Sequence, residues 1–317
     1  MNPEDLEKLK SEIRTCLATG LDTTFAIVGH TPLSYELRGY FHQIGAESRL
    51  LGVYAGEANV TGIRTLAQLK SDKPDFAIIA EDVDKELLLK AARPFLTPTT
   101  KLLLLGYGHF QFRHEIFDRV MRAALVPSLA NGYPNTLVHL FQCLQNSARL
   151  GLKGVVAEFG MFKGGTTLLL SSFIKELGRD WLVIGFDTFD GFPARRDVLD
   201  LYAHPGCIFR DEASVRHLVA DRRIEVVAGD VVATAARLSN ENVVLAFIDT
   251  DNYTSACSIL DVIQDRVVVG GAIVFDHFTG RNRHLYTLGE RIAAQRLLTD
   301  LRYFNLHDTG VFIRQGS

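Results

Sequence analysis

Residues 154–167 read GVVAEFGMFKGGTT, and this stretch decides the fold class of the second half of the chain. A short apolar run ends at an acid, passes through a glycine turn and opens into a helical pattern, which is typical of a strand followed by a crossover helix in a parallel sheet. Gly160 permits a tight turn, while Gly164 and Gly165 let a ligand approach the backbone amides at the start of the helix. The stretch therefore predicts a ligand-binding turn, with a simple packing turn as the alternative.

The chemistry of this turn favours a small anion. Its glycine spacing is G-x-x-x-G-G and not the G-x-G-x-x-G of a pyrophosphate cradle, and Lys163 adds a cation beside the glycines. An amino-acid carboxylate therefore fits the turn better than a dinucleotide does.

Five predicted strands in the second half each end at, or one residue from, an acid. The strands are GVVAEFG, WLVIGFD, IEVVAGD, VVLAFID and VVVGGAIVFD, and the acids are Glu158, Asp187, Asp230, Asp249 and Asp276. In an open parallel sheet, ligands bind outside the carboxyl ends of the strands, so five acids on that edge predict a site there. Any single one of them could instead be a turn former after its strand.

The remaining elements complete an α/β domain. Stretches of helical length separate the strands at 164–177, 212–220 and 253–265, and a long helix is predicted near 284–300. Two short apolar runs around the turn at 308–310 predict a terminal β-hairpin.

Two of the acids suggest a nucleoside. Asp187 ends the second strand, where doubly wound folds place the acid that accepts hydrogen bonds from ribose hydroxyls. Asp230 ends the third strand and is placed to contact an adenine. Together with the glycine turn, the two acids predict a pocket for a nucleoside joined to a small charged tail.

Asp249 and Asp276 end the fourth and fifth strands and are candidates for a metal site. If these strands are neighbours, their backbones lie about 4.8 Å apart and both carboxylates can reach one point. Two unpaired carboxylates that close repel one another, and a divalent cation relieves the repulsion. Asp251 could add a ligand or orient the first two, and His277 could be a ligand, a proton acceptor or neither. The alternative is a metal-free Asp that accepts hydrogen bonds from loop amides.

The first half reads as a separate, smaller domain. Residues 23–105 alternate four short apolar runs with amphipathic stretches of helical length, which predicts a Rossmann-like α/β module. Its first turn, FAIVGHTP, has a single glycine, which favours a module that positions an acceptor, a partner protein or a second subunit over a nucleotide site. Two helices follow in residues 109–150, and the domain boundary is predicted near residue 126, which gives domains 1–126 and 127–317.

Composition and charge exclude several classes of protein. The 317 residues are 47% hydrophobic and 22% charged with a formal net charge of -3, so no basic surface for nucleic acid is indicated. No apolar stretch of about eighteen residues occurs and the N-terminus is charged, so we expect no membrane partner and a cytoplasmic location. The cysteines form no C-x-x-C pair and are expected as reduced thiols, at Cys16, Cys143, Cys207 and Cys257. The sequence leaves open whether the protein forms a homo-oligomer.

Five motifs together resemble the macrocin-type sugar O-methyltransferases, which use S-adenosylmethionine and a divalent metal. They are EFGMFKGGT at 158–166, GFDTFDGFP at 185–193, FIDTDNY at 247–253, VVVGGAIVFD at 267–276 and TGVFIR at 309–314. The resemblance spans about residues 127–317. It implies a class I methyltransferase sheet of seven strands with the last pair antiparallel, which agrees with the predicted hairpin.

The resemblance also implies roles for individual residues. The glycine turn would hold the methionine end of S-adenosylmethionine, the segment at Asp187 the ribose, and the segment at Asp230 the adenine. The residues assigned to the cofactor are Glu158, Gly160, Phe162, Lys163, Gly164, Gly165, Thr166, Asp187, Thr188, Phe189, Asp230 and Val231. The metal ligands would be Asp249 and Asp276 with His277 as a candidate, and the catalytic base would be Asp249 or His277.

The sequence departs from this pattern at position 277, where the resemblance leads us to expect a second Asp. His277 removes one hard oxygen ligand, and an imidazole suits zinc, iron or manganese better than magnesium. The carboxylates still favour magnesium, with manganese or another transition ion as the alternatives.

These features predict an S-adenosylmethionine-dependent, divalent-metal-assisted O-methyltransferase that acts on a hydroxyl of a sugar, of a sugar-containing natural product or of a polysaccharide precursor. A metal chelated by vicinal oxygens of this small-molecule or saccharide acceptor would lower the hydroxyl pKa and fix its direction. The long loop at 194–211 is expected to face the acceptor, with further candidates at Arg281, Arg283 and His284. The alternatives are an NAD(P)-dependent oxidoreductase and a catalytically weak S-adenosylmethionine-binding module.

Overall fold

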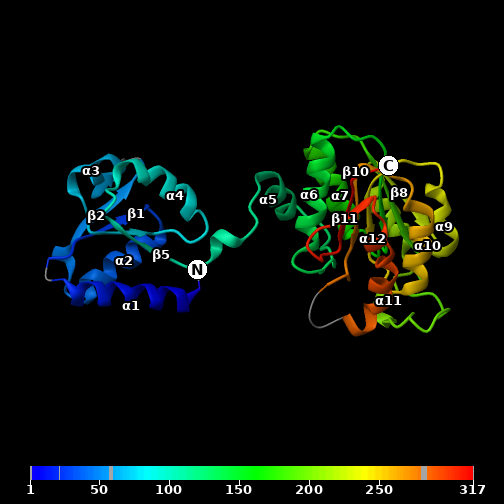
Figure 1. Ribbon diagram of the computed structural model, residues 1–317, viewed down its shortest axis with the longest axis horizontal. Coiled ribbons are helices and arrows are strands. Elements are labelled where there is room, and N and C mark those ends of the chain that lie inside the picture. Colours follow the sequence, from blue (N-terminus) through cyan, green and yellow to red (C-terminus); the bar gives the residue numbers. More distant parts are fainter. Residues whose placement is uncertain (1, 21, 57–59, 280–283, 317) are drawn as a thin grey trace. The chain divides into compact units, whose positions relative to one another are not determined.

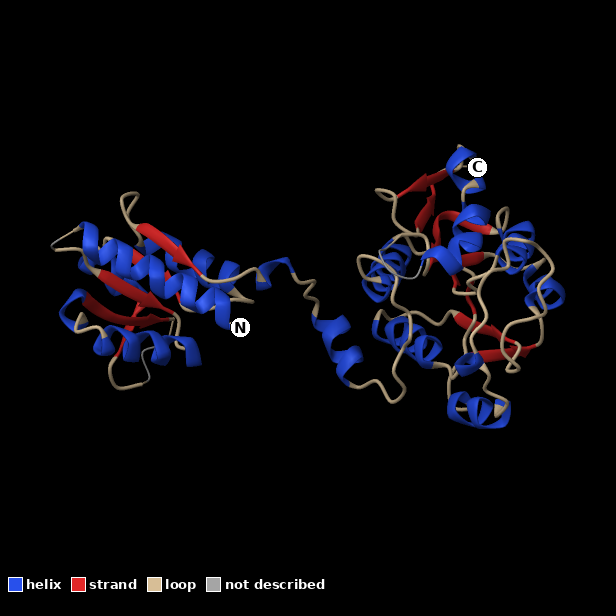
Figure 2. Ribbon diagram, turned by 90° about the horizontal axis from the view of Figure 1, so that it is seen from below, coloured by secondary structure: helices blue, strands red, loops and turns tan. Residues whose placement is uncertain are grey.

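The computed structural model describes residues 2–20, 22–56, 60–279 and 284–316. The chain divides into two compact units, Met1–Phe112 and Arg113–Ser317. In each unit a sheet is enclosed by helices on both faces, as Figure 1 shows along the chain and Figure 2 shows by secondary structure. Both units therefore have the α/β architecture predicted from the alternating pattern.

The division between the units falls earlier than the predicted boundary near residue 126. Helix α5 (Glu115–Arg122) packs on α7 (Gly165–Glu176) of the second unit. The rings of Phe117 and Phe173 stack with centroids 5.6 Å apart, an apolar contact that ties α5 to this unit.

The first unit contains a parallel sheet of five strands in the order β3-β2-β1-β4-β5. The strands are β1 (Phe25–Val28), β2 (Leu50–Ala55), β3 (Ile63–Thr65), β4 (Phe76–Ile79) and β5 (Lys101–Leu104). Helices cover both faces: α1 (Pro3–Thr19) and α2 (Pro32–Gln43) on one, α3 (Leu69–Asp72) and α4 (Lys85–Ala92) on the other. The pattern predicted four strands and missed the short edge strand β3.

The second unit contains a sheet of seven strands in the order β11-β12-β10-β9-β6-β7-β8. Strand β12 runs antiparallel to both of its neighbours, and the other pairs are parallel. This arrangement confirms the predicted fold and the terminal hairpin. The strands are β6 (Val155–Phe159), β7 (Leu182–Asp187), β8 (Ile224–Ala228), β9 (Val243–Ile248), β10 (Val267–Phe275), β11 (Tyr303–Asn305) and β12 (Val311–Arg314).

Helices cover both faces of this sheet (Figure 1). Every residue of β9 is buried, because helices cover the sheet on both faces. A parallel strand in this position therefore needs a continuous apolar run. One face carries α5, α6 (Thr136–Arg149), α7 and α8 (Glu212–Val219), and the other carries α9 (Val231–Thr234), α10 (Tyr253–Ile263), α11 (His284–Ala294) and α12 (Arg296–Thr299).

The register of the central strands brings their carboxyl ends to one edge. Phe159 of β6 pairs with Phe186 of β7 and with Ile248 of β9, and Ile248 pairs with Phe275 of β10. The turns that follow these four strands therefore start side by side. This edge is where the sequence predicts a site.

None of the helices in the described ranges has the length and apolar character that crossing a membrane requires. All four cysteines are free thiols, as predicted.

Candidate active site

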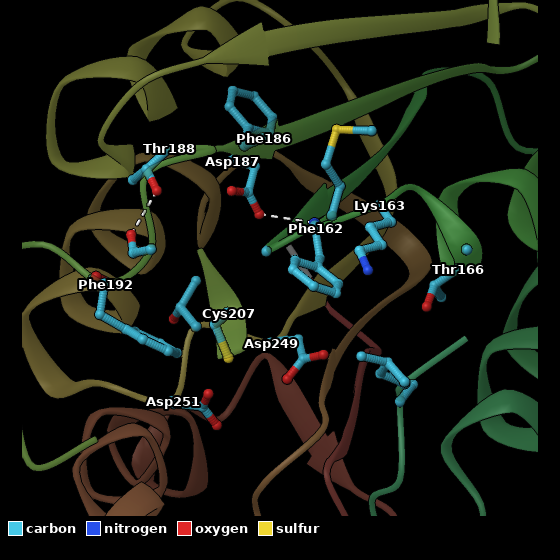
Figure 3. A pocket seen from close by; sticks show the side chains of 18 of the residues that line it. Phe162, Lys163, Thr166, Phe186, Asp187, Thr188, Phe192, Cys207, Asp249 and Asp251 are labelled. Atoms are coloured by element: carbon cyan, nitrogen blue, oxygen red, sulfur yellow. Dashed lines mark hydrogen bonds between the residues drawn. The ribbon is translucent and has the colours of Figure 1, made fainter. Parts of the chain in front are cut away.

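A cavity of about 420 Å³ opens at this edge of the second unit. Its lining comes from the turns after β6, β7, β9 and β10 and from residues 126–131 ahead of α6. Figure 3 shows the carboxylates of Asp249 and Asp251 across the cavity from Asp187. A cavity therefore lies at the edge of the sheet where the strand-end acids predict a site.

The turn after β6 has the backbone geometry that its glycines predict. Gly160 has a φ of +92° and Gly164 a φ of +79°, both in the left-handed region that favours glycine. A Cβ at Gly160 would lie 2.1 Å from the Asp249 carbonyl oxygen, so the backbones that follow β6 and β9 are in direct contact here. Gly164 is the N-cap of α7. The other predicted turn residues line the cavity, namely Gly160, Phe162, Lys163, Gly165 and Thr166.

We expect Gly160→Ala to destabilise the second unit. Its methyl group would press on the Asp249 carbonyl and would occupy a positive φ, which together lower the free energy of unfolding by about 2 kcal/mol or more. Urea unfolding measures the loss. Gly151→Ala is the matched control, because Gly151 has a φ of +67° but an added Cβ would meet nothing within 4 Å. Equal losses in the two variants would show that the contact with Asp249 is irrelevant.

Asp187, at the end of β7, lies between the glycine turn and the cavity. Its Oδ2 accepts the Phe162 N–H at 2.8 Å, and its Oδ1 accepts the Phe189 N–H at 2.7 Å. Burial raises the pKa of Asp187 in spite of these hydrogen bonds. Thr188 also lines the cavity, whereas Phe189 is buried in the cluster that contains Met161.

Glu158 lies beneath the turn and outside the cavity lining. It is buried and accepts a hydrogen bond from the Thr167 hydroxyl at 2.5 Å. Burial raises the pKa of Glu158 to about 8, and the nearby charge of Asp187 adds to the shift. Glu158 therefore supports the turn from below, and its contact with the methionine end stays a prediction.

The raised pKa of Glu158 should make stability fall as the pH rises. Between pH 4.5 and about 8 the unfolded chain has released this proton while the folded chain keeps it, so the free energy of unfolding decreases across this window. Glu158→Gln should flatten that part of the profile measured by urea unfolding, and Glu115→Gln on the exposed surface of α5 should not. A parent-like slope in Glu158→Gln would refute the assignment.

Asp230 and Val231 have different surroundings. Val231 lines the cavity. Asp230 caps α9 by accepting the Val232 N–H at 3.0 Å and forms an ion pair with Arg196 at 2.6 Å. An adenine contact of Asp230 would have to compete with Arg196 and stays a prediction.

Asp249, Asp251 and His277 converge on one point of the cavity. One ligand atom from each lies within 4.8 Å of the others, and all three residues line the cavity. The His277 Nε2 lies 3.1 Å from Asp251 Oδ1, 3.6 Å from Asp249 Oδ1 and 3.4 Å from Asp276 Oδ2. Burial, together with the charges of Asp276 and Asp251, raises the pKa of Asp249 well above its ordinary value. Two carboxylates and an imidazole at this spacing form a candidate site for a divalent cation.

Asp276 has a different environment from the one predicted for a metal ligand. It is 1% exposed and is not part of the cavity lining. Its carboxylate accepts the N–H groups of Asn131 at 3.0 Å and Gly132 at 2.9 Å, and the hydroxyl of Thr136 at 2.6 Å. These contacts correspond to the alternative of an Asp that holds loop amides. Its Oδ2 also lies 3.4 Å from His277 Nε2, so a role of Asp276 as a metal ligand stays a prediction, and Asp251 joins the converging group.

Two parts of the site carry no signal in the sequence. Residues 126–131 line the cavity beside α7, and a Cβ at Gly165 would lie 2.3 Å from the Pro127 carbonyl oxygen. Glu290 of α11 is buried against the turn after β9. Both come from segments far along the chain from the strand ends that they touch, so no local pattern points to them.

The loop at 194–211 forms one wall of the cavity and is anchored to the turn after β9. The Asn252 side chain accepts the Tyr202 N–H and donates to the Tyr202 carbonyl, both at 2.9 Å. Asp200 accepts the N–H and the hydroxyl of Thr254, both at 2.8 Å. Tyr202 lines the cavity, and its ring meets that of Phe192 edge to face with centroids 5.1 Å apart.

The arginines of this loop have partners outside the cavity. Arg196 pairs with Asp230 and Arg210 with Asp190, both at 2.6 Å. Arg281, Arg283 and the side chain of His284 lie outside the described residues. Among the described residues of this loop, the cavity lining consists of Tyr202, Gly206 and Cys207.

Comparison with known proteins identifies the enzyme class. Residues 157–278 match the family model described as a methyltransferase domain. The comparison with curated proteins found no match. The chain therefore carries a class I, S-adenosylmethionine-dependent methyltransferase domain, which confirms the predicted type of enzyme.

Several solved structures are similar to this chain. One is the O-methyltransferase NovP, with 19% identity and a TM-score of 0.48 over 57% of this chain and 79% of NovP. A second is CalS11, a calicheamicin methyltransferase, with 22% identity and a TM-score of 0.45 over 66% of this chain and 96% of CalS11. The apo structure of CalS11, described as a TDP-rhamnose 3'-O-methyltransferase, shows 19% identity and a TM-score of 0.40 over 66% and 98% of the two chains.

Proposed function

We propose that the protein is a divalent-metal-assisted O-methyltransferase whose acceptor is a hydroxyl of a sugar or of a sugar-containing molecule. The observation that carries the proposal is the convergence of Asp249, Asp251 and His277 in the cavity that Asp187 and the glycine turn line from the other side. A candidate metal site and a candidate cofactor site thus lie in the same cavity. The motif resemblance supports a sugar over other vicinal hydroxyls.

The cavity offers the groups that S-adenosylmethionine requires. The Lys163 ammonium lies over the rings of Phe162 and Phe209, 5.0 and 5.1 Å from their centroids, beside the start of α7. This cation and the first amides of the helix suit the methionine carboxylate. Asp187 would accept hydrogen bonds from the ribose, and Val231 would pack on the adenine. The bound cofactor supplies a methyl group already activated on a sulfonium, which leaves positioning to the protein.

The donor set also fits a divalent cation. Asp249, Asp251 and His277 would hold it, and the pKa of Asp249 is elevated first by burial and then by the nearby carboxylates. An imidazole among two carboxylates suits manganese, iron or zinc better than magnesium. A bound cation would lower the pKa of the acceptor hydroxyl and fix its direction.

The side chains of the site would move the proton and align the acceptor. Asp249 or His277 would accept the hydroxyl proton, and the residues that line the cavity would hold the acceptor oxygen in line with the methyl group that the bound cofactor would supply. Tyr202 and Phe192 present an aromatic wall on which the apolar face of a sugar ring can pack.

Methyl transfer from labelled S-adenosylmethionine to a panel of glycosides and catechols, with Mn²⁺ or with a chelator, tests the proposal. We expect transfer to a glycoside that the chelator abolishes and Mn²⁺ restores. Thermal shifts with S-adenosylhomocysteine and with NAD distinguish the alternatives. Stabilisation by NAD alone would indicate an oxidoreductase, and binding of S-adenosylhomocysteine without transfer to any acceptor would indicate a binding module.

Asn252→Ala should weaken acceptor binding selectively. It removes both hydrogen bonds that hold the Tyr202 backbone, and their loss of about 1.4 kcal/mol corresponds to a tenfold increase of KM for the acceptor. The Kd of S-adenosylhomocysteine, measured by calorimetry, should stay within about twofold of the parent value. Equally weaker binding of the acceptor and of S-adenosylhomocysteine would mean that Asn252 supports the whole cavity and not only the part formed by Tyr202.

A further inference from the structure

Glu290 is a fully buried carboxylate that touches the backbone of both loops that carry the candidate metal ligands. It lies on α11 and is 0% exposed. Its Oε2 accepts the N–H of Thr250 at 2.9 Å and that of Asp251 at 2.7 Å. Its Oε1 accepts the N–H of His277 at 3.4 Å. One side chain therefore links the turn after β9 to the loop after β10.

Helix packing alone does not account for a carboxylate at this position. The neighbouring core positions Ala293, Ala294 and Leu297 are apolar and buried. A carboxylate among them is unfavourable unless it is hydrogen-bonded. Three of the hydrogen bonds that Glu290 accepts come from backbone amides and a fourth comes from the Thr250 hydroxyl at 3.4 Å, so they fix the course of the main chain that carries the metal ligands.

Asp251 is the ligand that depends most on such a contact. Its φ of +62° lies in the left-handed region, which is unfavourable by about 1–3 kcal/mol for a residue other than glycine. The hydrogen bond from its own N–H to Glu290 offsets part of this strain. Without that acceptor the peptide can relax to negative φ, and the Asp251 carboxylate then moves away from His277.

We propose that Glu290 is a positioning residue that holds Asp251 and His277 in register for metal binding. The inference rests on the proposed function, because it presumes a cation at Asp249, Asp251 and His277. Groups that orient metal ligands typically change metal affinity by about 10–100-fold when they are removed. The same range is expected for Glu290, which touches no metal itself.

The test compares Mn²⁺ affinity in four full-length proteins by titration with electron paramagnetic resonance. Glu290→Ala removes the acceptor and should weaken Mn²⁺ binding at least tenfold. Glu290→Gln should weaken binding less than Glu290→Ala, because its amide oxygen can accept the two N–H groups that Oε2 accepts now, while its NH₂ group replaces only the acceptor of the longer hydrogen bond from His277. Leu297→Ala is the control for lost stability, because it removes a buried side chain from the same core that makes no hydrogen bond to either loop, and it should bind Mn²⁺ as the parent does. The Kd of S-adenosylhomocysteine should be unchanged in all four.

Glu290→Asp replaces the alanine variant should the latter not fold. Its carboxylate is withdrawn by about one bond length of 1.5 Å, so it should bind Mn²⁺ more weakly than Glu290→Gln although it keeps a carboxyl group. The inference is overturned if Glu290→Ala binds like the parent, if Glu290→Gln is as weak as the alanine or aspartate variant, or if Leu297→Ala loses Mn²⁺ equally. A parent protein that binds no Mn²⁺ removes the metal-assisted function and this inference together, whereas a binding parent with an unaffected Glu290→Ala removes only the inference.

Discussion

Asp249→Asn and Asp251→Asn should each lower the rate of methyl transfer at least about a hundredfold. Each variant removes one anionic oxygen from the converging group, and the loss of a single oriented electrostatic contact in an active site typically lowers kcat by about 10²–10³. The variants should stay folded, since burial and the neighbouring acids already disfavour the charged form of Asp249. Initial rates with labelled S-adenosylmethionine measure the effect.

Asp261→Asn is the matched control for this pair. Asp261 stands on α10, with 70% of its side chain exposed, and pairs with Arg296 outside the cavity. It should methylate at the parent rate. S-adenosylhomocysteine should bind all three variants as it binds the parent. Parent-like rates in both Asp249→Asn and Asp251→Asn would eliminate the metal-assisted chemistry while leaving the fold intact.

Asp276→Ala should be the most destabilising single change at the site. It removes the acceptor of the buried Gly132 N–H and Thr136 hydroxyl and of the Asn131 N–H. Each such loss costs about 1–3 kcal/mol, so the free energy of unfolding should fall by about 3 kcal/mol or more. For a domain of this size that corresponds to a decrease of roughly 6–12 °C in Tm.

Thr136→Val is the partial variant that calibrates this effect. It removes one of the three donors to Asp276 and should lower the free energy of unfolding by about 1 kcal/mol. Calorimetry of the two variants provides both values. An Asp276→Ala protein with the parent Tm but without Mn²⁺ binding would identify Asp276 as a ligand, as first predicted, and not as the anchor of the turn at 131–136.

The fold of the second unit could be predicted because its elements carry strong local signals. Buried parallel strands such as β9 are continuous apolar runs, and the glycine turn after β6 has a spacing that requires positive φ. The acids at the strand ends also pointed to the correct edge, where Asp187 and Asp249 line the cavity. In the first unit, β3 was missed because three residues followed by a helical turn carry too little alternation to be recognised.

The roles of the individual acids could not be predicted, because they depend on contacts from distant segments. Asp276 and Asp251 were both candidates, and nothing in the local sequence shows which distant segment contacts each of them. The turn at 131–136 occupies the carboxylate of Asp276, and Glu290 holds the left-handed turn that carries Asp251 toward His277. The sequence shows where the strands end, but it does not show which helix or loop contacts those ends.

Anomalous diffraction from crystals grown with Mn²⁺ and S-adenosylhomocysteine tests the central claim most directly. We predict one strong manganese peak in contact with Asp249, Asp251 and His277, with the cofactor sulfur facing it from the side of Asp187. A manganese peak elsewhere, no peak at saturating Mn²⁺, or a sulfur that faces away from these three side chains would contradict the account.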